Sequence, residues 1–169
     1  MKRLGSLLSG SIALLASKLA YSAGAEGLSQ AYSAIDKLNS SLSEYGGSLV
    51  VGQESIELIL PEKISFEFAE DSFTQAETVK ALAEFIKVMP EGIFVRVTGH
   101  TDSVGKAVDN QDLGLRRASR VMFQLVESGV SPSRIIVGSK GEQDQLVESK
   151  GSKLANRRVE IELISRLSP

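Results

Sequence analysis

The sequence predicts an α/β sandwich, in which a mixed sheet carries two helices on one face and is preceded by an N-terminal helix. Strand patterns alternate with helical patterns from residue 48 onward, which indicates a sheet covered by helices. The 169 residues have room for one ordinary domain and an extension. A hydrophobic fraction of 42% and a charged fraction of 24% are typical of a folded globular protein.

The expected element order is β-α-β-α-β-β. Alternating or β-branched runs predict strands over residues 56–60, 64–68, 93–98, 135–137 and 158–163. Apolar residues at helical spacing predict helices over residues 74–89 and 113–126, ended by Pro90 and Gly129. Strands joined through helices should run parallel by the right-handed crossover rule. We expect the last strand to pair antiparallel, either at an edge or between the others.

Residues 1–25 resemble a secretory signal peptide. A basic start precedes an apolar run over residues 4–16, and Ala23-Gly24-Ala25 suits signal peptidase. Thirteen helical residues span roughly 20 Å, which is short of the roughly 30 Å hydrocarbon core of a bilayer. The alternatives are an uncleaved membrane anchor that starts near Leu4 and a helix that is not a signal.

Residues 26–47 predict an amphipathic helix that ends at Gly46-Gly47. Its apolar residues follow a strict alternation of three- and four-residue steps, namely Leu28, Ala31, Ile35, Leu38, Leu42 and Tyr45. Two alternatives stay open for this seam. The helix lies against the following domain or is loosely ordered, or it pairs with another chain through self-association.

Composition excludes several classes of function. The chain has no cysteine, so disulfides, thiol nucleophiles, cysteine-ligated metals and a lipid anchor on an N-terminal cysteine are excluded. A net charge of −2 and the scarcity of aromatic residues argue against a nucleic-acid partner. We expect no cofactor and no metal site.

The candidate site is built on Asp102 and Arg117. Asp102 follows the strand that ends near Thr98, and Arg117 is placed in the first turns of the next predicted helix. A carboxylate and a guanidinium at such a junction suit a zwitterion, because each pairs with one pole of an amino acid. The alternative is that the two side chains form a salt bridge with each other and shape the loop.

The sequence is less specific about the roles of the neighbouring polar residues. His100 is the sole histidine, and residues one to three apart on an extended segment do not assemble a catalytic triad, so we expect it to form structural hydrogen bonds. No nucleophile with a base is apparent, so we expect no catalytic residue and no enzymatic activity. Either Arg157 or Arg158 reaches the Asp102 loop, or both lie at a solvated strand end.

Several motifs in this region keep a spacing that is found in one known family. They are Gly99-His100-Thr101-Asp102-x-x-Gly105, Asn110-x-x-Leu113-x-x-Arg116-Arg117-Ala118, Gly129-Val130 and Asn156-Arg157-Arg158-Val159. With these motifs, residues 48–165 resemble the C-terminal domain of OmpA-like proteins, which include peptidoglycan-associated lipoproteins and the periplasmic part of flagellar MotB. Gly114 departs from the serine that most members carry, and residues 143–153 lack a proline that is frequent there. We expect the glycine to soften the start of the helix, since it offers no capping side chain.

The resemblance implies non-covalent binding of peptidoglycan through the diaminopimelate of its stem peptide, which would tether an envelope component to the cell wall. It assigns the amino-acid end of diaminopimelate to Asp102 and Arg117, and the pocket lining to Thr101, Asn110, Leu113 and Arg158. The expected location is the periplasm or the outer membrane, with an envelope protein as a candidate partner. The alternative function is an inner-membrane-anchored component similar to MotB.

Overall fold

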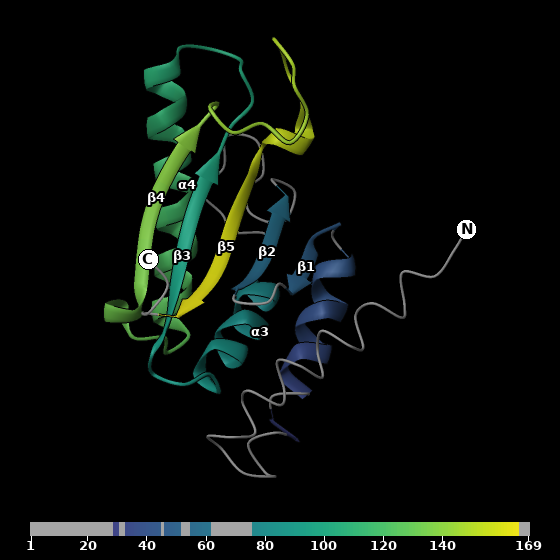
Figure 1. Cartoon of the computed structure of the whole chain (residues 1–169), viewed down its shortest axis with the longest axis vertical. Helices are drawn as coiled ribbons and strands as arrows, with labels where there is room; N and C mark the ends of the chain where they lie inside the picture. Colours follow the sequence, from purple (N-terminus) through teal and green to yellow (C-terminus); the bar gives the residue numbers. More distant parts are fainter. Residues whose placement is uncertain (1–28, 31–32, 45, 52–54, 62–75, 166–169) are drawn as a thin grey trace, which may run out of the picture.

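The computed structural model describes residues 29–30, 33–44, 46–51, 55–61 and 76–165 (Figure 1). The elements are β1 (Ser48–Val51), β2 (Ser55–Pro61), α3 (Ala76–Lys87), β3 (Ile93–His100), α4 (Ala107–Glu127), β4 (Ile135–Gly141) and β5 (Arg158–Ser165). Two short 3-10 turns, η1 (Pro132–Arg134) and η2 (Leu154–Asn156), precede β4 and β5. Another helix covers residues 33–44. The expected signal peptide and the expected strand over 64–68 lie outside the described residues.

The five strands form one mixed sheet in the order β1-β2-β5-β3-β4. The β3-α4-β4 unit gives a parallel pair, as the crossover rule predicts. The last strand, β5, lies between β2 and β3 and runs antiparallel to both, which selects one of the two expected placements. This register sets His100 at the end of β3 opposite Arg158 at the start of β5.

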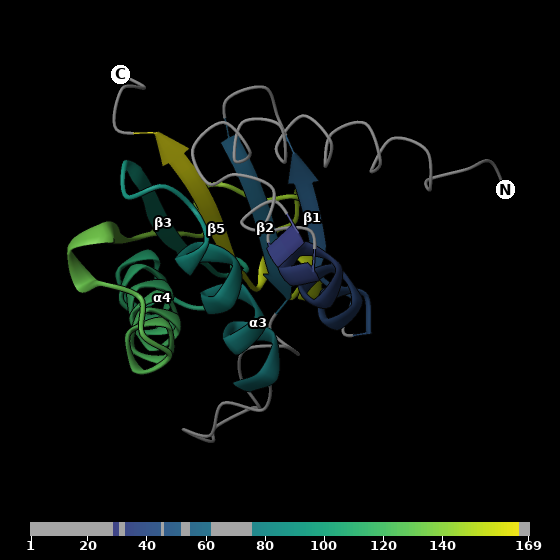
Figure 2. The same ribbon diagram turned by 90° about the horizontal axis from the view of Figure 1, so that it is seen from below.

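Helices cover one face of the sheet (Figure 2). The period-two pattern of β5 is confirmed, because its inward-facing apolar residues are buried and alternate with Glu160 and Glu162 on the other face; the buried set is Val159, Ile161 and Leu163. The two-helix layer that the sequence predicts is formed by α3 and α4, which also contact each other. The helix over residues 33–44 adds a third member to this layer beside α3 (Figure 2).

The apolar seam of the 33–44 helix belongs to the core of the domain. Ile35, Leu38 and Leu42 are at most 1% exposed. The Ser41 hydroxyl lies 2.7 Å from the Thr78 hydroxyl of α3, which adds a polar link between the two helices. The structure therefore supports packing against the domain, and these seam residues are not available to another chain.

The helix α4 begins at Ala107, six residues before its predicted start. Asn110 and Leu113 therefore lie inside the helix, and Arg117 is ten residues beyond its start instead of the predicted four. The expected softening by Gly114 is wrong, since this glycine is in mid-helix. A Cβ atom at Gly99 of β3 would lie 1.9 Å from the Gly114 carbonyl oxygen, so the helix and the strand approach each other here through two glycines.

Other boundaries differ by shorter stretches. Helix α3 ends at Lys87, two residues before the predicted end, which agrees with the tendency of helices to end at or before the residue that precedes a proline, here Met89. Strands β3 and β4 extend further than predicted, to His100 and Gly141, and so carry the sheet up to the candidate site.

Candidate functional site

The sequence-predicted site residues gather at the end of the sheet where β3 ends and β5 begins (upper end of Figure 1). Three segments meet there: residues 101–106 after β3, the first three turns of α4, and the loop of residues 142–157 between β4 and β5. The C-terminal end of β3 and the N-terminal end of the antiparallel β5 are adjacent by register. The topology of the sheet therefore assembles the site from segments that are distant in sequence.

Asp102 is the most connected carboxylate of the site. It is 5% exposed, and its Oδ2 atom accepts hydrogen bonds from Arg157 Nε at 2.7 Å and from the Lys153 amide at 3.3 Å. Its Oδ1 atom accepts a bond from the Val104 amide at 3.3 Å. Burial raises the pKa of Asp102, but the Arg157 guanidinium and the two amides lower it more, so the net shift is below the usual 3.8. Asp102 is thus held as an anion.

Arg117 reaches the same end of the sheet from α4. Its side chain is mostly buried, and Nη1 donates a hydrogen bond of 3.3 Å to the His100 carbonyl oxygen. His100 stands two residues before Asp102, so the guanidinium and the carboxylate approach one short segment of backbone. The first-turn amides of α4 do not belong to this contact, because Arg117 is ten residues beyond Ala107.

The residues expected to line the pocket have different environments. The Thr101 amide donates to the Gly141 carbonyl at 2.8 Å, and its buried hydroxyl has no hydrogen-bond partner in the described part of the chain. Asn110 is 4% exposed and donates to Glu142 Oε2 at 2.5 Å. Leu113 is half-buried. The Thr101 hydroxyl is therefore a buried polar group that a ligand could satisfy.

The two arginines at the start of β5 point to different partners. Arg157 contacts Asp102 and also donates to the Ser152 hydroxyl at 2.6 Å. Arg158, which the sequence assigned to the pocket, is 2% exposed and donates to Glu160 Oε1 at 2.7 Å through Nε. Its Nη2 also donates to the Asp144 carbonyl at 3.0 Å. The sequence left open which arginine reaches the Asp102 loop, and the structure selects Arg157.

His100 faces Glu160 beneath the site. Its imidazole is fully buried, and Nε2 lies 3.1 Å from Glu160 Oε2. Within the described part of the chain, neither ring nitrogen of His100 forms a well-directed hydrogen bond. Burial raises the pKa of Glu160, but His100 and the Arg158 guanidinium outweigh it and lower the pKa to about 2. The structural hydrogen bonds expected for His100 are therefore not found among the described residues, and its close contact there is with Glu160.

The 142–157 loop is fixed at several points around the site. The Asn156 side chain is fully buried and exchanges two hydrogen bonds with the Val147 backbone, at 3.0 and 2.8 Å. Ser103 donates its hydroxyl to the Ser149 carbonyl at 2.7 Å. The sequence did not predict that Glu142 would bind Asn110 or that Glu160 would bind Arg158. The alternation of β5 places Glu160 beside Arg158 on one face, whereas nothing in the local pattern around Glu142 indicates its contact with Asn110.

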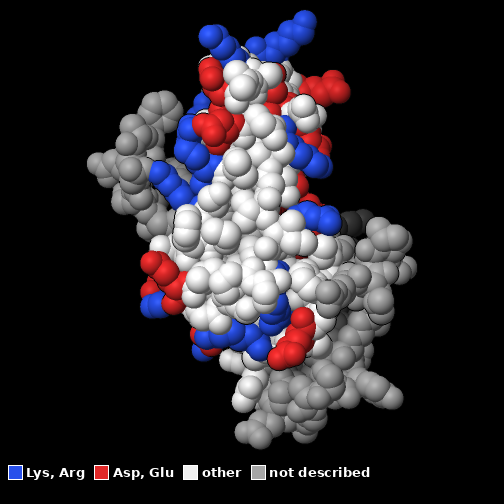
Figure 3. All heavy atoms as spheres, turned by 90° about the vertical axis from the view of Figure 1, so that its left-hand side faces the viewer, with Lys and Arg blue, Asp and Glu red and all other residues white. Residues whose placement is uncertain are grey.

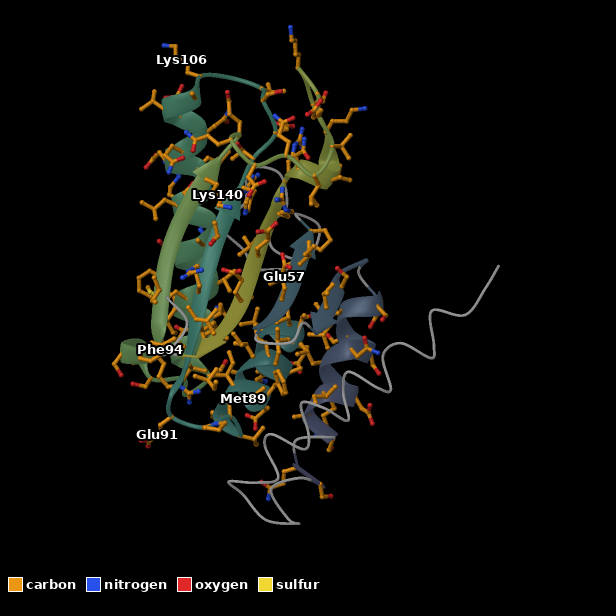
Figure 4. All side chains as sticks on the ribbon, viewed as in Figure 1. Glu57, Met89, Glu91, Phe94, Lys106 and Lys140 are labelled. Carbon is orange, nitrogen blue, oxygen red and sulfur yellow. The ribbon has the colours of Figure 1, made fainter. Side chains whose placement is uncertain are left out.

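Charged side chains of both signs gather at this end on the side of α4 and β4, with an uncharged band below them (Figure 3). A hollow of about 600 Å³ lies at the opposite end of the sheet and is lined by Met89, Glu91, Phe94 and Arg134, among others. Figure 4 shows Met89, Glu91 and Phe94 at that end, far from Lys106 at the site end. The hollow is therefore separate from the candidate site.

The described residues also show their capacity for metal ligation and for membrane spanning. Within the part of the chain that the structure describes, no three His, Cys, Asp or Glu side chains are grouped so that they could hold a metal ion. Among the same residues, no helix has the length and apolar character needed to cross a membrane.

Comparison with known proteins shows which family the motifs and the fold belong to. The profile of the OmpA family matches residues 66–159, which contain every predicted site residue. The chain belongs to the OmpA family. The matched segment includes β3, α4, β4 and the start of β5, and so the whole region that surrounds Asp102.

Several relatives of this OmpA-family chain are named as outer-membrane or peptidoglycan-associated proteins. Outer membrane porin F of Pseudomonas fluorescens is 44% identical over 84 residues, which are 48% of this chain and 26% of that protein. The peptidoglycan-associated lipoprotein of Legionella pneumophila is 37% identical over 113 residues, 63% of this chain and 64% of the relative. The alignments thus span only a part of these relatives.

A solved structure shares the architecture. The periplasmic domain of Helicobacter pylori MotB superposes with a TM-score of 0.63 at 26% sequence identity. The match covers 72% of this OmpA-family chain and 80% of the MotB domain. It extends beyond the 66–159 segment, which fits a domain whose core also includes elements upstream of residue 66.

Proposed function

We propose that this chain binds peptidoglycan non-covalently through the diaminopimelate of its stem peptide and tethers an envelope component to the cell wall. The observation that carries the proposal is the placement of Asp102 and Arg117 at one end of the sheet. Both side chains are nearly buried, and Arg117 donates to the backbone carbonyl of His100, two residues before Asp102. Diaminopimelate presents an ammonium and a carboxylate on one carbon, and these charges complement the two side chains.

Shielding from water strengthens the contacts that this site can make with a charged ligand. Exposed ion pairs contribute about 0–1 kcal/mol each, whereas charge-assisted hydrogen bonds in a shielded site are stronger. Among the described residues Asp102 accepts from three donors, which leaves about one of the roughly four acceptor positions of a carboxylate for a ligand ammonium. Arg117 supplies a planar fork for the ligand carboxylate, and the Thr101 hydroxyl is a further polar group within the site.

The names of the relatives support the same proposal at a coarser level. One relative is a peptidoglycan-associated lipoprotein and another is an outer membrane porin. A wall-binding module of this class would act in the periplasm or at the outer membrane, and we extend that location to this chain. The proposal includes no enzymatic activity, because the described site contains no nucleophile paired with a base. Release of muropeptides from sacculi by the purified protein would contradict that part.

The direct test is co-sedimentation of the purified chain with sacculi, with free diaminopimelate as competitor. We expect binding that the competitor abolishes, and loss of at least about tenfold in affinity for Asp102→Asn and for Arg117→Gln, because each removes one charge partner of the zwitterion. Circular dichroism and thermal unfolding establish that both variants remain folded. Full retention of binding in the two folded variants would place the ligand elsewhere.

A second candidate is an inner-membrane-anchored component similar to MotB. It is favoured by the superposition on the MotB periplasmic domain. In this case residues near Leu4 onward would stay attached as an anchor. N-terminal sequencing of the protein from the envelope separates the two candidates, since a start near Glu26 excludes the anchor.

A further inference from the structure

Arg157 and Arg158 are adjacent in sequence but hold different parts of the site. The backbone at Arg157 is extended, so successive side chains point to opposite sides. Arg158 points to the Glu160 side, where it is buried and donates to two backbone carbonyls of the 142–157 region. Arg157 points to Asp102 and Ser152. Arg157 thus contacts the Asp102 carboxylate, whereas Arg158 contacts only backbone carbonyls of the loop and Glu160 among the described residues.

Among the described residues that donate to Asp102, Arg157 makes the dominant contact. The Val104 and Lys153 amides lie at 3.3 Å, which is long for an N–H to oxygen hydrogen bond. The Arg157 Nε bond is 2.7 Å long and joins two charged groups, so it is the strongest of the three. The Asp102 and Arg157 side chains are only 8% and 20% exposed, which limits screening by water.

We propose that Arg157 is the positioning residue of the site, which aims the Asp102 carboxylate at the ligand and ties the 142–157 loop to it through Ser152. This inference rests on the proposed function, because it concerns the residue that prepares Asp102 for the ligand ammonium. Arg157 itself acts through Asp102 and leaves the ligand carboxylate to Arg117.

Removal of the guanidinium has a defined chemical consequence. Asp102 would remain nearly buried with two long amide bonds, so its pKa would rise and it would take up a proton at mildly acidic pH. A protonated carboxyl no longer attracts the ligand ammonium. Among the described residues, the other ionisable side chains near this segment are Arg117 on the His100 carbonyl, His100 and Arg158 beside Glu160, Glu142 with Asn110, and Lys153, whose amide donates to Asp102. They are the same in the wild type and in the variant, so the difference between the two pH profiles isolates Asp102.

The experiment is isothermal titration of the purified chain with meso-diaminopimelate from about pH 7 to about pH 4.5, where the ligand keeps its charges. Wild-type affinity should stay nearly constant over this range. Arg157→Gln should lose affinity as the pH falls, to about tenfold below wild type at the acidic end, because protonation of Asp102 removes its attraction for the ligand ammonium. Arg157→Lys, which keeps the charge, should restore most of the affinity. Arg96→Gln is the matched control, since it removes a guanidinium that pairs with Glu162 on the open sheet face.

The outcomes separate this inference from the proposed function. No heat of binding in the wild type, together with no sacculus binding, would reject the proposed function itself. Wild-type binding with an unchanged pH profile in Arg157→Gln would overturn only the inference. A loss that is equal at every pH and accompanied by a lower melting temperature would also overturn it, because it would indicate a merely structural arginine. Carbon NMR titration of the Asp102 carboxyl should show the raised pKa directly in the folded variant.

Discussion

At the residue scale, the group formed by His100, Arg158 and Glu160 couples the stability of the fold to pH. The Glu160 carboxylate is 15% exposed, accepts from the Arg158 guanidinium and lies against the buried imidazole. Its pKa is lowered from 4.5 to about 2 on folding. A group with a lowered pKa stabilises the folded state above its unfolded pKa, and this contribution is lost as the pH falls through the folded value. The window is therefore between pH 4.5 and about pH 2.

We predict that the free energy of unfolding of the wild type falls by about 3 kcal/mol across this window from Glu160 alone. Glu160→Gln should be less stable than the wild type at neutral pH and should show a flatter decline on acidification, because the amide does not titrate. Urea denaturation at several pH values measures both effects. Arg96→Gln, which breaks an exposed pair of β3 and β5, serves as the control and should change stability by less than about 1 kcal/mol. Parallel declines in the wild type and Glu160→Gln would contradict the prediction.

At the element scale, the position of Arg117 depends on how closely α4 approaches β3. Gly99 and Gly114 form this contact, in which a Cβ atom at Gly99 would meet the Gly114 carbonyl carbon at 2.5 Å and its oxygen at 1.9 Å. Both neighbours are backbone atoms and cannot rotate away. A side chain at Gly99 would therefore push the helix from the sheet and move Arg117 relative to the His100 carbonyl.

We predict that Gly99→Ala destabilises the domain by about 2–3 kcal/mol, the usual cost of overpacking, and also weakens sacculus binding. Gly138→Ala on the neighbouring β4 is the matched control, because a Cβ atom there would meet nothing within 4 Å. The control should be nearly neutral in both assays. Urea denaturation and co-sedimentation provide the two measurements. If both alanine variants behaved alike, the close approach of the helix to the strand would not limit the site.

The start of α4 also shows what a single sequence can and cannot predict about an element. The sequence predicted the helix from its apolar spacing after Leu113, but Asp109 and Asn110 look like loop residues because their side chains compete with the backbone in isolated segments. In the folded chain Asn110 is held by Glu142 instead, a contact between distant residues. Strand β1 was missed for a similar reason, since its four residues gain their order from pairing with β2.

At the scale of the whole molecule, the predicted fold class is confirmed because periodicity is a local signal and the crossover rule restricts the topology. The side-chain contacts of the site were predicted less completely. Asp102 and Arg117 were predicted as a pair from charge and spacing, but the contact of Asp102 with Arg157 joins residues 55 positions apart. Only the insertion of β5 between β2 and β3 makes that contact, and the sequence left the place of β5 open.

The same topology implies that ligand binding should act on one end of the molecule. Residues 101–106 and 142–157 meet at the end of β3, whereas the turn between α3 and β3 and the η1 turn lie at the opposite end (Figure 1). We predict that free diaminopimelate slows amide hydrogen exchange in the first two segments, including the Val104 and Lys153 amides that donate to Asp102. Exchange near Pro90 and η1 should be unchanged, which provides an internal control. Mass-spectrometric exchange with and without ligand measures this, and Asp102→Asn should remove the effect. Protection centred on the hollow near Phe94 and Arg134 would instead assign the ligand to the far end and contradict the proposed site.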